Sequence, residues 1–183
     1  MIDGSEMHEE AMGTSAPGAG PGHVWGTWPP QSKVDASQSG GARRTVVRAI
    51  VVDHQATARR GLLRELRFEP DLEVVGEANT AEAGVALAQD QRPDIVVMDV
   101  EMPVMDGVQA AERLHALAPD CVIMLLTMRD SVETHERGRA AGARVVLEKG
   151  NPAIFRNTFH DLVQFVKARN TQAWPETGAA DAQ

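Results

Sequence analysis

The chain has 183 residues, a formal net charge of −8 and a hydrophobic fraction of 43%. This length suits one domain with tails, and the acidic balance argues against nonspecific binding to nucleic acid or to anionic membranes. The single cysteine excludes an internal disulfide framework and a cysteine metal cluster. No apolar run reaches the roughly 18 residues of a membrane span, and the acidic N-terminus is unlike a signal peptide. We therefore expect a cytoplasmic protein that does not enter a membrane.

The N-terminal part of the chain differs in composition from the rest. Residues 1–45 are rich in Gly, Pro, Ser and Ala and lack apolar periodicity, so we expect a disordered leader. Trp25 and Trp28 interrupt it, either as isolated aromatic residues or as a short anchor that folds on binding a partner. We expect the folded domain at residues 46–170 and a flexible tail at residues 171–183.

Short apolar runs alternate with segments of helical periodicity in the folded part of the chain. In chain order, we expect a strand at 48–53, a helix at 55–68, a strand at 73–78, a helix at 80–91, a strand at 94–99, a helix at 108–118, a strand at 121–127, a helix at 130–143, a strand at 144–149 and a helix at 151–170. Thr80 and Asn151 are expected N-caps, and Pro152 suits a first helical position. The alternation and the apolar strands predict an α/β fold with a doubly wound, five-stranded parallel sheet.

Polar residues stand at the ends of four expected strands, where ligands of such sheets bind. Asp53 and then His54 end the first strand, Asp99 the third, Thr127 the fourth and Lys149 the fifth. Two carboxylates could hold Mg²⁺, and an aspartate beside the cation can attack a phosphoryl group. A lysine would neutralise the phosphoryl oxygens, and a threonine hydroxyl could hydrogen-bond to them. An aspartate alone often only caps a helix, but the four positions together indicate a phosphorylation site.

The segment VVMDVEMPVMDG at residues 96–107 resembles the phosphoacceptor strand and loop of the receiver domain of two-component response regulators. The pattern Asp-x-x-Met-Pro-x-x-Asp-Gly is intact, and the resemblance extends over residues 48–168 without a gap. It is greatest to the branch whose full-length members carry a helix-turn-helix output domain. The resemblance implies a flavodoxin-like strand order of 2-1-3-4-5. It also implies a signalling role, with self-catalysed phosphorylation and dephosphorylation as the only enzymatic activity.

The resemblance also implies a role for each matching residue. Asp99 matches the phosphorylated aspartate, Thr127 the switch hydroxyl, and Lys149 the lysine that contacts the phosphoryl group. The implied Mg²⁺ ligands are the carboxylates of Asp53 and Asp99 and the backbone carbonyl of Glu101. In the following turn, Gly107 is expected to supply a permissive backbone at the start of the third helix.

Two positions depart from the family pattern. His54 replaces the second adjacent acid, and imidazole suits zinc or copper better than Mg²⁺, so we expect His54 to weaken Mg²⁺ binding. Tolerated drift, a pH-sensitive or metal-independent site, and compensation by the Glu101 carboxylate are the open interpretations. Val146 stands where the family usually has a Tyr or Phe that reorients on activation, so the aromatic half of the switch is absent.

Two helices have unusual composition. The fourth contains Gly138 and few large apolar residues, which predicts that it is the least stable of the five. The last helix has more apolar residues than one face can bury. We expect the surplus, Phe155 or Phe165, to form a dimer or partner surface.

Thirteen residues, 171–183, follow the last expected helix, which is fewer than a helix-turn-helix module needs. We therefore expect a stand-alone response regulator that does not bind DNA. A sensor histidine kinase would phosphorylate Asp99 and so switch the face of the fourth helix, fifth strand and fifth helix toward a downstream protein partner or a second copy. The alternatives are a phosphorylation-independent interaction module, which His54 and Val146 favour, and a phosphotransfer intermediate.

Overall fold

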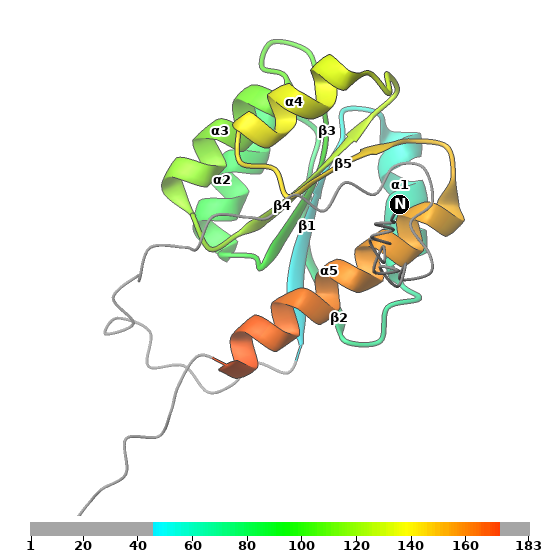
Figure 1. Ribbon diagram of the computed structural model, residues 1–183, viewed down its shortest axis with the longest axis vertical. Coiled ribbons are helices and arrows are strands. Elements are labelled where there is room, and N and C mark those ends of the chain that lie inside the picture. The colour runs from blue at the N-terminus through cyan, green and yellow to red at the C-terminus, as the bar shows by residue number, and fades with distance from the viewer. Residues whose placement is uncertain (1–45, 173–183) are drawn as a thin grey trace, which may run out of the picture. The chain divides into compact units, whose positions relative to one another are not determined.

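The computed structural model describes residues 46–172, which form a parallel sheet between two layers of helices (Figure 1). In chain order, the elements are β1 (Val47–Val52), α1 (Ala56–Leu66), β2 (Leu72–Ala78), α2 (Ala81–Gln91), β3 (Ile95–Asp99), α3 (Gly107–Leu117), β4 (Val122–Thr127), α4 (Val132–Ala140), β5 (Val145–Glu148) and α5 (Pro152–Gln172). The expected leader and most of the expected tail lie outside the described residues. No helix among residues 46–172 is long and apolar enough to cross a membrane.

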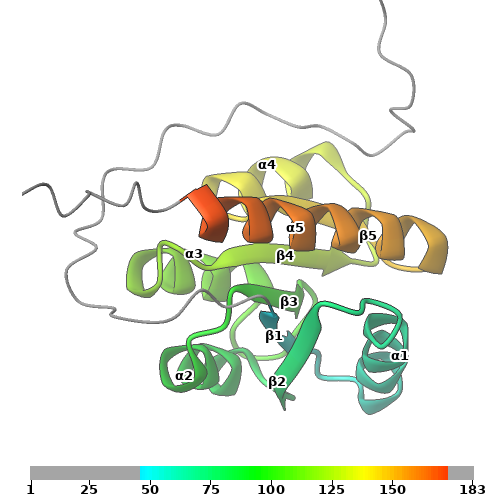
Figure 2. The same cartoon turned by 90° about the horizontal axis from the view of Figure 1, so that it is seen from below.

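The strand order is β2-β1-β3-β4-β5, and every neighbouring pair is parallel. The predicted fold class and strand order are therefore confirmed. The helices α2, α3 and α4 cover one face of the sheet, and α1 and α5 cover the other (Figures 1 and 2). This topology places the carboxyl ends of β1, β3, β4 and β5 side by side at one end of the sheet.

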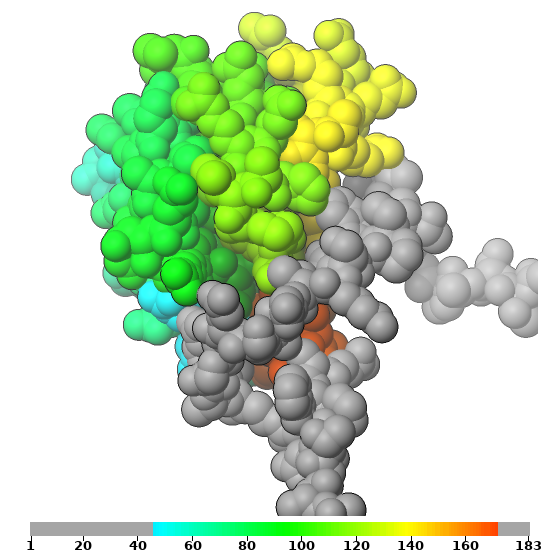
Figure 3. All heavy atoms as spheres, turned by 90° about the vertical axis from the view of Figure 1, so that its left-hand side faces the viewer, coloured from blue at the N-terminus to red at the C-terminus, as the bar shows by residue number. Residues whose placement is uncertain are grey.

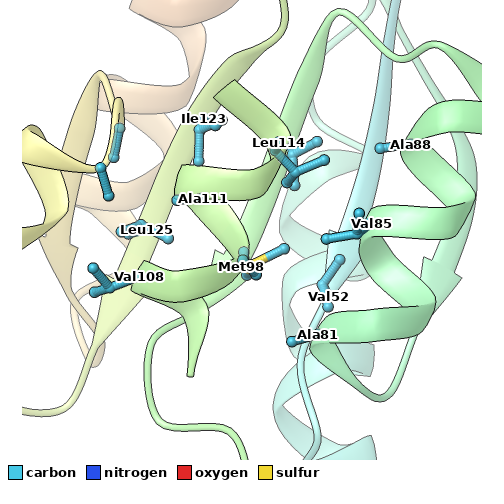
Figure 4. Close-up of a cluster of buried hydrophobic side chains, with 14 of the residues drawn as sticks. Val52, Ala81, Val85, Ala88, Met98, Val108, Ala111, Leu114, Ile123 and Leu125 are labelled. Atoms are coloured by element: carbon cyan, nitrogen blue, oxygen red, sulfur yellow. The ribbon is translucent and has the colours of Figure 1, made fainter. Parts of the chain in front are cut away.

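Both faces of the sheet are buried, which explains why β3 and β4 are apolar up to their last residues, Asp99 and Thr127. All residues of β3 and β4 are buried. Alternate strand residues belong to two separate cores. Figure 4 shows the core under α2 and α3, where Val52, Met98 and Leu125 meet Val85 and Leu114. Because packing fixes each strand on both faces, the polar residues at the strand ends have defined positions.

The predicted helix N-caps are confirmed. Thr80 accepts a hydrogen bond from the Ala83 N–H, and Asn151 accepts bonds from the N–H groups of Ala153 and Ile154. Pro152 is the first residue of α5, as expected. The helix α5 ends at Gln172, two residues beyond the expected end.

The helix α4 is shorter than the predicted 130–143. It begins after Ser131, whose hydroxyl accepts a bond from the Thr134 N–H, and it ends at Ala140. The chain then turns at Gly142, which has a φ of +91°. Figure 3 shows α3 between α2 and α4 on the outer surface of this layer.

Gly138 allows α4 to pack closely on the sheet. It is the one buried residue of this helix. A Cβ atom at Gly138 would lie 2.5 Å from Cγ2 of Val146 and 3.2 Å from Cδ1 of Leu125. The glycine that lowers helix propensity is thus required by the contact between α4 and β5. The low stability expected for α4 stays a prediction.

The surplus apolar surface expected at Phe155 is absent, because Phe155 is buried and stacks with Phe159 at a ring-centre distance of 5.8 Å. Phe165 is partly buried, and the Arg144 guanidinium lies 3.6 Å from the centre of its ring. On the described part of α5, the exposed large apolar residue is Ile154.

Candidate functional site

The ends of four strands bring Asp53, Asp99, Thr127 and Lys149 together. The strand register aligns Val52 with Met98 and Asp99 with Leu126. The polar residues at the carboxyl ends of these strands therefore lie close together. Both aspartates and the threonine are buried, with 1% or less of each residue exposed. The four polar residues that the sequence places at strand ends therefore form one compact group of side chains.

Lys149 bridges the two buried aspartates. Its Nζ lies 2.7 Å from Oδ1 of Asp99 and 2.9 Å from Oδ2 of Asp53. Burial raises the pKa of Asp99, and the nearby Lys149 ammonium offsets only part of this effect. Burial alone would lower the pKa of Lys149, but its hydrogen bonds to Asp99 and Asp53 outweigh burial and raise that pKa. The lysine is therefore held as a cation beside Asp99.

His54 contacts the other carboxylate oxygen of Asp99. Its Nδ1 lies 3.0 Å from Oδ2 of Asp99 and 4.0 Å from Oδ1 of Asp53. The backbone N–H of Glu101 donates to Oδ1 of Asp99 at 3.1 Å. Each oxygen of the Asp99 carboxylate therefore has a nitrogen neighbour in this structure.

Asp53, His54 and Asp99 form a candidate metal site. One ligand atom from each residue lies within 4.8 Å of the others. Two buried carboxylates beside a half-buried imidazole fit a divalent cation. The imidazole nitrogen is the one donor of the three that Mg²⁺ does not favour.

The Glu101 side chain points to β4 and bonds to its end. Its Oε1 accepts a hydrogen bond from Oγ1 of Thr127 at 2.6 Å, and its Oε2 accepts one from the Met128 N–H at 3.1 Å. Burial alone would raise the pKa of Glu101, but these hydrogen bonds outweigh burial and lower it. No pattern in the sequence predicts this contact, because the two residues are 26 positions apart and meet only through the register of β3 and β4.

The chain needs a glycine at position 107, where α3 begins, because there is no room for a side chain. A Cβ atom at Gly107 would lie 2.1 Å from the backbone oxygen of Asp99. Gly107 has no positive φ, so the expected need for a permissive backbone is wrong, and close approach is the reason. Asp106 caps α3 through a capping box with Gln109.

A cavity of about 220 Å³ lies beside the site, between α1 and the start of α5. Asp53 and Lys149 line one side of it. Apolar groups line much of the rest, and Gly61 leaves open space where a side chain would stand. The buried carboxylates thus adjoin an accessible apolar surface.

Comparison with known proteins shows which family has this fold and these strand-end residues. The model of the response regulator receiver domain matches residues 49–156. The signal receiver domain of NarL from Mycobacterium tuberculosis superimposes with a TM-score of 0.61 and 26% sequence identity, over 65% of this chain and 97% of that domain.

The chain matches two curated relatives over part of each relative's length. The protein-glutamate methylesterase/protein-glutamine glutaminase 4 of Myxococcus xanthus is 39% identical over 144 residues, which are 74% of this chain and 41% of the relative. The transcriptional regulatory protein PdtaR of Mycobacterium tuberculosis is 39% identical over 104 residues, which are 56% of this chain and 49% of the relative. The chain therefore spans less than half the length of each relative. Because the family match extends from β1 into α5 and includes all the strand-end residues, the chain belongs to the response regulator receiver domain family.

Proposed function

We propose that Asp99 accepts a phosphoryl group from a sensor histidine kinase and that this modification switches protein contacts of the domain. The observation that carries the proposal is the pair of Asp99 and Lys149. A buried carboxylate, 1% exposed, lies 2.7 Å from a lysine ammonium that can neutralise an added phosphoryl group. The apolar cavity beside Lys149 favours a protein as phosphoryl donor, because an apolar surface can bind a helix of the kinase.

In the proposed reaction, a carboxylate oxygen of Asp99 attacks the phosphorus of a phosphohistidine. A bond forms between this oxygen and phosphorus, and the bond from phosphorus to the donor nitrogen breaks. The electron pair of the broken bond leaves with the imidazole, and Asp99 becomes an acyl phosphate. Lys149 then shifts from the carboxylate toward the phosphoryl oxygens, where its charge is needed.

We propose that Mg²⁺ assists this reaction and that His54 weakens its binding. The carboxylates of Asp53 and Asp99 and the backbone carbonyl of Glu101 would hold the ion, which would supply further neutralisation of phosphoryl charge when bound. The Glu101 carboxylate bonds to Thr127, which argues against its use as a replacement for the missing acid.

The proposed signalling surface comprises α4, β5 and α5, and it would contact a downstream protein or a second copy of the chain. Two large apolar residues are exposed near it: Val132 at the start of α4 is 75% exposed, and Met128 after β4 is 64% exposed. Exposed apolar side chains of this kind favour a protein partner over DNA.

The proposal is tested with acetyl phosphate and Mg²⁺, and the mass of the intact protein is the readout. We expect one phosphoryl addition to the wild-type chain and none to Asp99→Asn. If no divalent cation supports any addition, the proposal is wrong.

A second candidate function is a phosphorylation-independent interaction module. It is favoured by His54, which engages Asp99 at 3.0 Å, and by the buried Val146 in place of a switch aromatic. Partner binding distinguishes the two functions. The module would bind its partner equally well with and without the phosphodonor, and Asp99→Asn would leave this binding unchanged.

A further inference from the structure

The hydroxyl of Thr127 is already engaged by a charged acceptor. It donates to Oε1 of Glu101 at 2.6 Å, and a longer contact of 3.2 Å leads to the carbonyl of Arg129. The Arg129 N–H donates to the same hydroxyl at 2.9 Å, and the Met128 N–H donates to Glu101. The end of β4 is thus hydrogen-bonded to the loop that follows Asp99.

A threonine hydroxyl has one proton to donate. Thr127 is fully buried in this arrangement, and its hydroxyl has the Glu101 carboxylate as the near acceptor and the Arg129 carbonyl as the more distant one. A phosphoryl oxygen on Asp99 could accept this proton only after the bond to Glu101 breaks. The two acceptors therefore exclude each other.

We propose that Glu101 is a positioning residue that holds Thr127 in the unphosphorylated arrangement and competes with the Asp99 phosphoryl group for its proton. The inference rests on the proposed function, because it requires a modified Asp99. A phosphoryl group carries roughly −1.5 to −2 charges, more than one carboxylate, so it is the stronger competitor. Glu101 would then set how far modification of Asp99 shifts the domain into its switched state.

The position of Glu101 in the chain fits this role. Its backbone N–H bonds to Asp99, while its carboxylate bonds to residues after β4. The carboxylate is therefore anchored to the phosphoacceptor loop and acts on the neighbouring strand. Met128 is exposed, so water can bond to its N–H when the carboxylate is removed.

The test uses beryllofluoride, a phosphoryl mimic, as an equilibrium probe of the full chain at saturating Mg²⁺. Its apparent affinity is measured for the wild type, Glu101→Ala, Glu101→Gln, Thr127→Val and the double variant Glu101→Ala/Thr127→Val. Glu112→Ala on the exposed side of α3 serves as the charge control. Thermal unfolding of each variant verifies that the fold is kept.

We expect Glu101→Ala to tighten beryllofluoride binding about tenfold or more, which is the effect of losing one charged hydrogen bond. Glu101→Gln should give a smaller gain, because its amide oxygen still accepts a bond from Thr127. In the Thr127→Val background the gain should disappear, because no hydroxyl is left to compete for. Glu112→Ala should have no effect.

Two results would overturn the inference. An equal gain in both Thr127 backgrounds would show that Glu101 acts only through its charge, and no gain at all would show that it does not restrain Thr127. Both leave the proposed function standing. Failure of the wild type and all variants to bind beryllofluoride would instead overturn the proposed function, and the inference with it.

Discussion

Nδ1 of His54 lies 3.0 Å from Oδ2 of Asp99, while Lys149 contacts Oδ1 of the same carboxylate. An imidazole thus stands where the family has a second acid, within hydrogen-bond distance of Asp99, the proposed phosphoacceptor. This contact connects the main departure from the family pattern to the proposed chemistry.

We predict that His54→Asp tightens Mg²⁺ binding by roughly tenfold or more, because it adds a charged oxygen ligand beside Asp53 and Asp99. Isothermal titration calorimetry with Mg²⁺ measures the change. Ni²⁺ is the matched control, because it accepts imidazole well, and His54→Asp should improve Ni²⁺ binding less. Equal Mg²⁺ affinities for the wild type and the variant would show that His54 does not weaken the site.

Lys149 is predicted to stabilise the fold as well as the site. Lys149→Met would leave the buried carboxylates of Asp53 and Asp99 side by side without a cation. We expect a loss of about 3 kcal/mol in the free energy of unfolding, measured with urea at pH 7.

The control for this prediction is Lys167→Met. Lys167 pairs with Asp71 at a more exposed position, so its removal should cost less than about 1 kcal/mol. Similar losses for both lysine variants would mean that Lys149 is not the counter-charge of the two aspartates.

Gly138 tests the packing of α4, and Gly61 in α1 is its control. Gly138→Ala places a methyl group 2.5 Å from Val146, so we expect a loss of about 1–3 kcal/mol in stability despite the better helix propensity of alanine. Gly61→Ala meets no atom within 4 Å, so alanine should stabilise α1 by about 0.5–1 kcal/mol. Urea unfolding of both variants measures the opposite signs, and a stabilising Gly138→Ala would contradict the close contact.

Cys121 gives a prediction for alkaline pH. Burial, aided by the Asp94 carboxylate, raises the pKa of its thiol to about 12. In the unfolded chain this thiol ionises near its ordinary pKa of 9.0, so its contribution to stability is complete below that pH and is lost as pH rises toward 12.

Between pH 9 and pH 10, the wild type should therefore lose about 1 kcal/mol more unfolding free energy than Cys121→Ala. Urea unfolding at several pH values provides the comparison. Parallel pH profiles of the two proteins would contradict the buried, neutral thiol.

The sequence was sufficient to predict the fold and the polar residues that meet at the strand ends. The apolar runs ended on Asp53, Asp99, Thr127 and Lys149, and the rule that parallel strands align their carboxyl ends brings these residues together. The fold class depended only on chain order and on burial of both sheet faces, and the strand order came from the family resemblance. The proximity of these residues could therefore be predicted from the sequence pattern without knowledge of any side-chain conformation.

Other features depended on distances between elements, which a sequence pattern does not contain. The sequence shows that Gly138 lowers the helix propensity of α4, but it does not show that the close contact with Val146 requires a glycine there. The bond from Thr127 to Glu101 requires one particular direction of the Glu101 side chain. Phe155 or Phe165 was expected on the surface, but Phe155 is buried and stacks with Phe159.

Location of the phosphoryl group on Asp99 is the most direct test of the central claim. The full chain is treated with acetyl phosphate and a divalent cation, and the acyl phosphate is then trapped by reduction with borohydride before peptide mass spectrometry. We predict reduction of Asp99 alone, with none in the untreated protein or in Asp99→Asn. Modification at another residue, or none with any cation, would contradict the account.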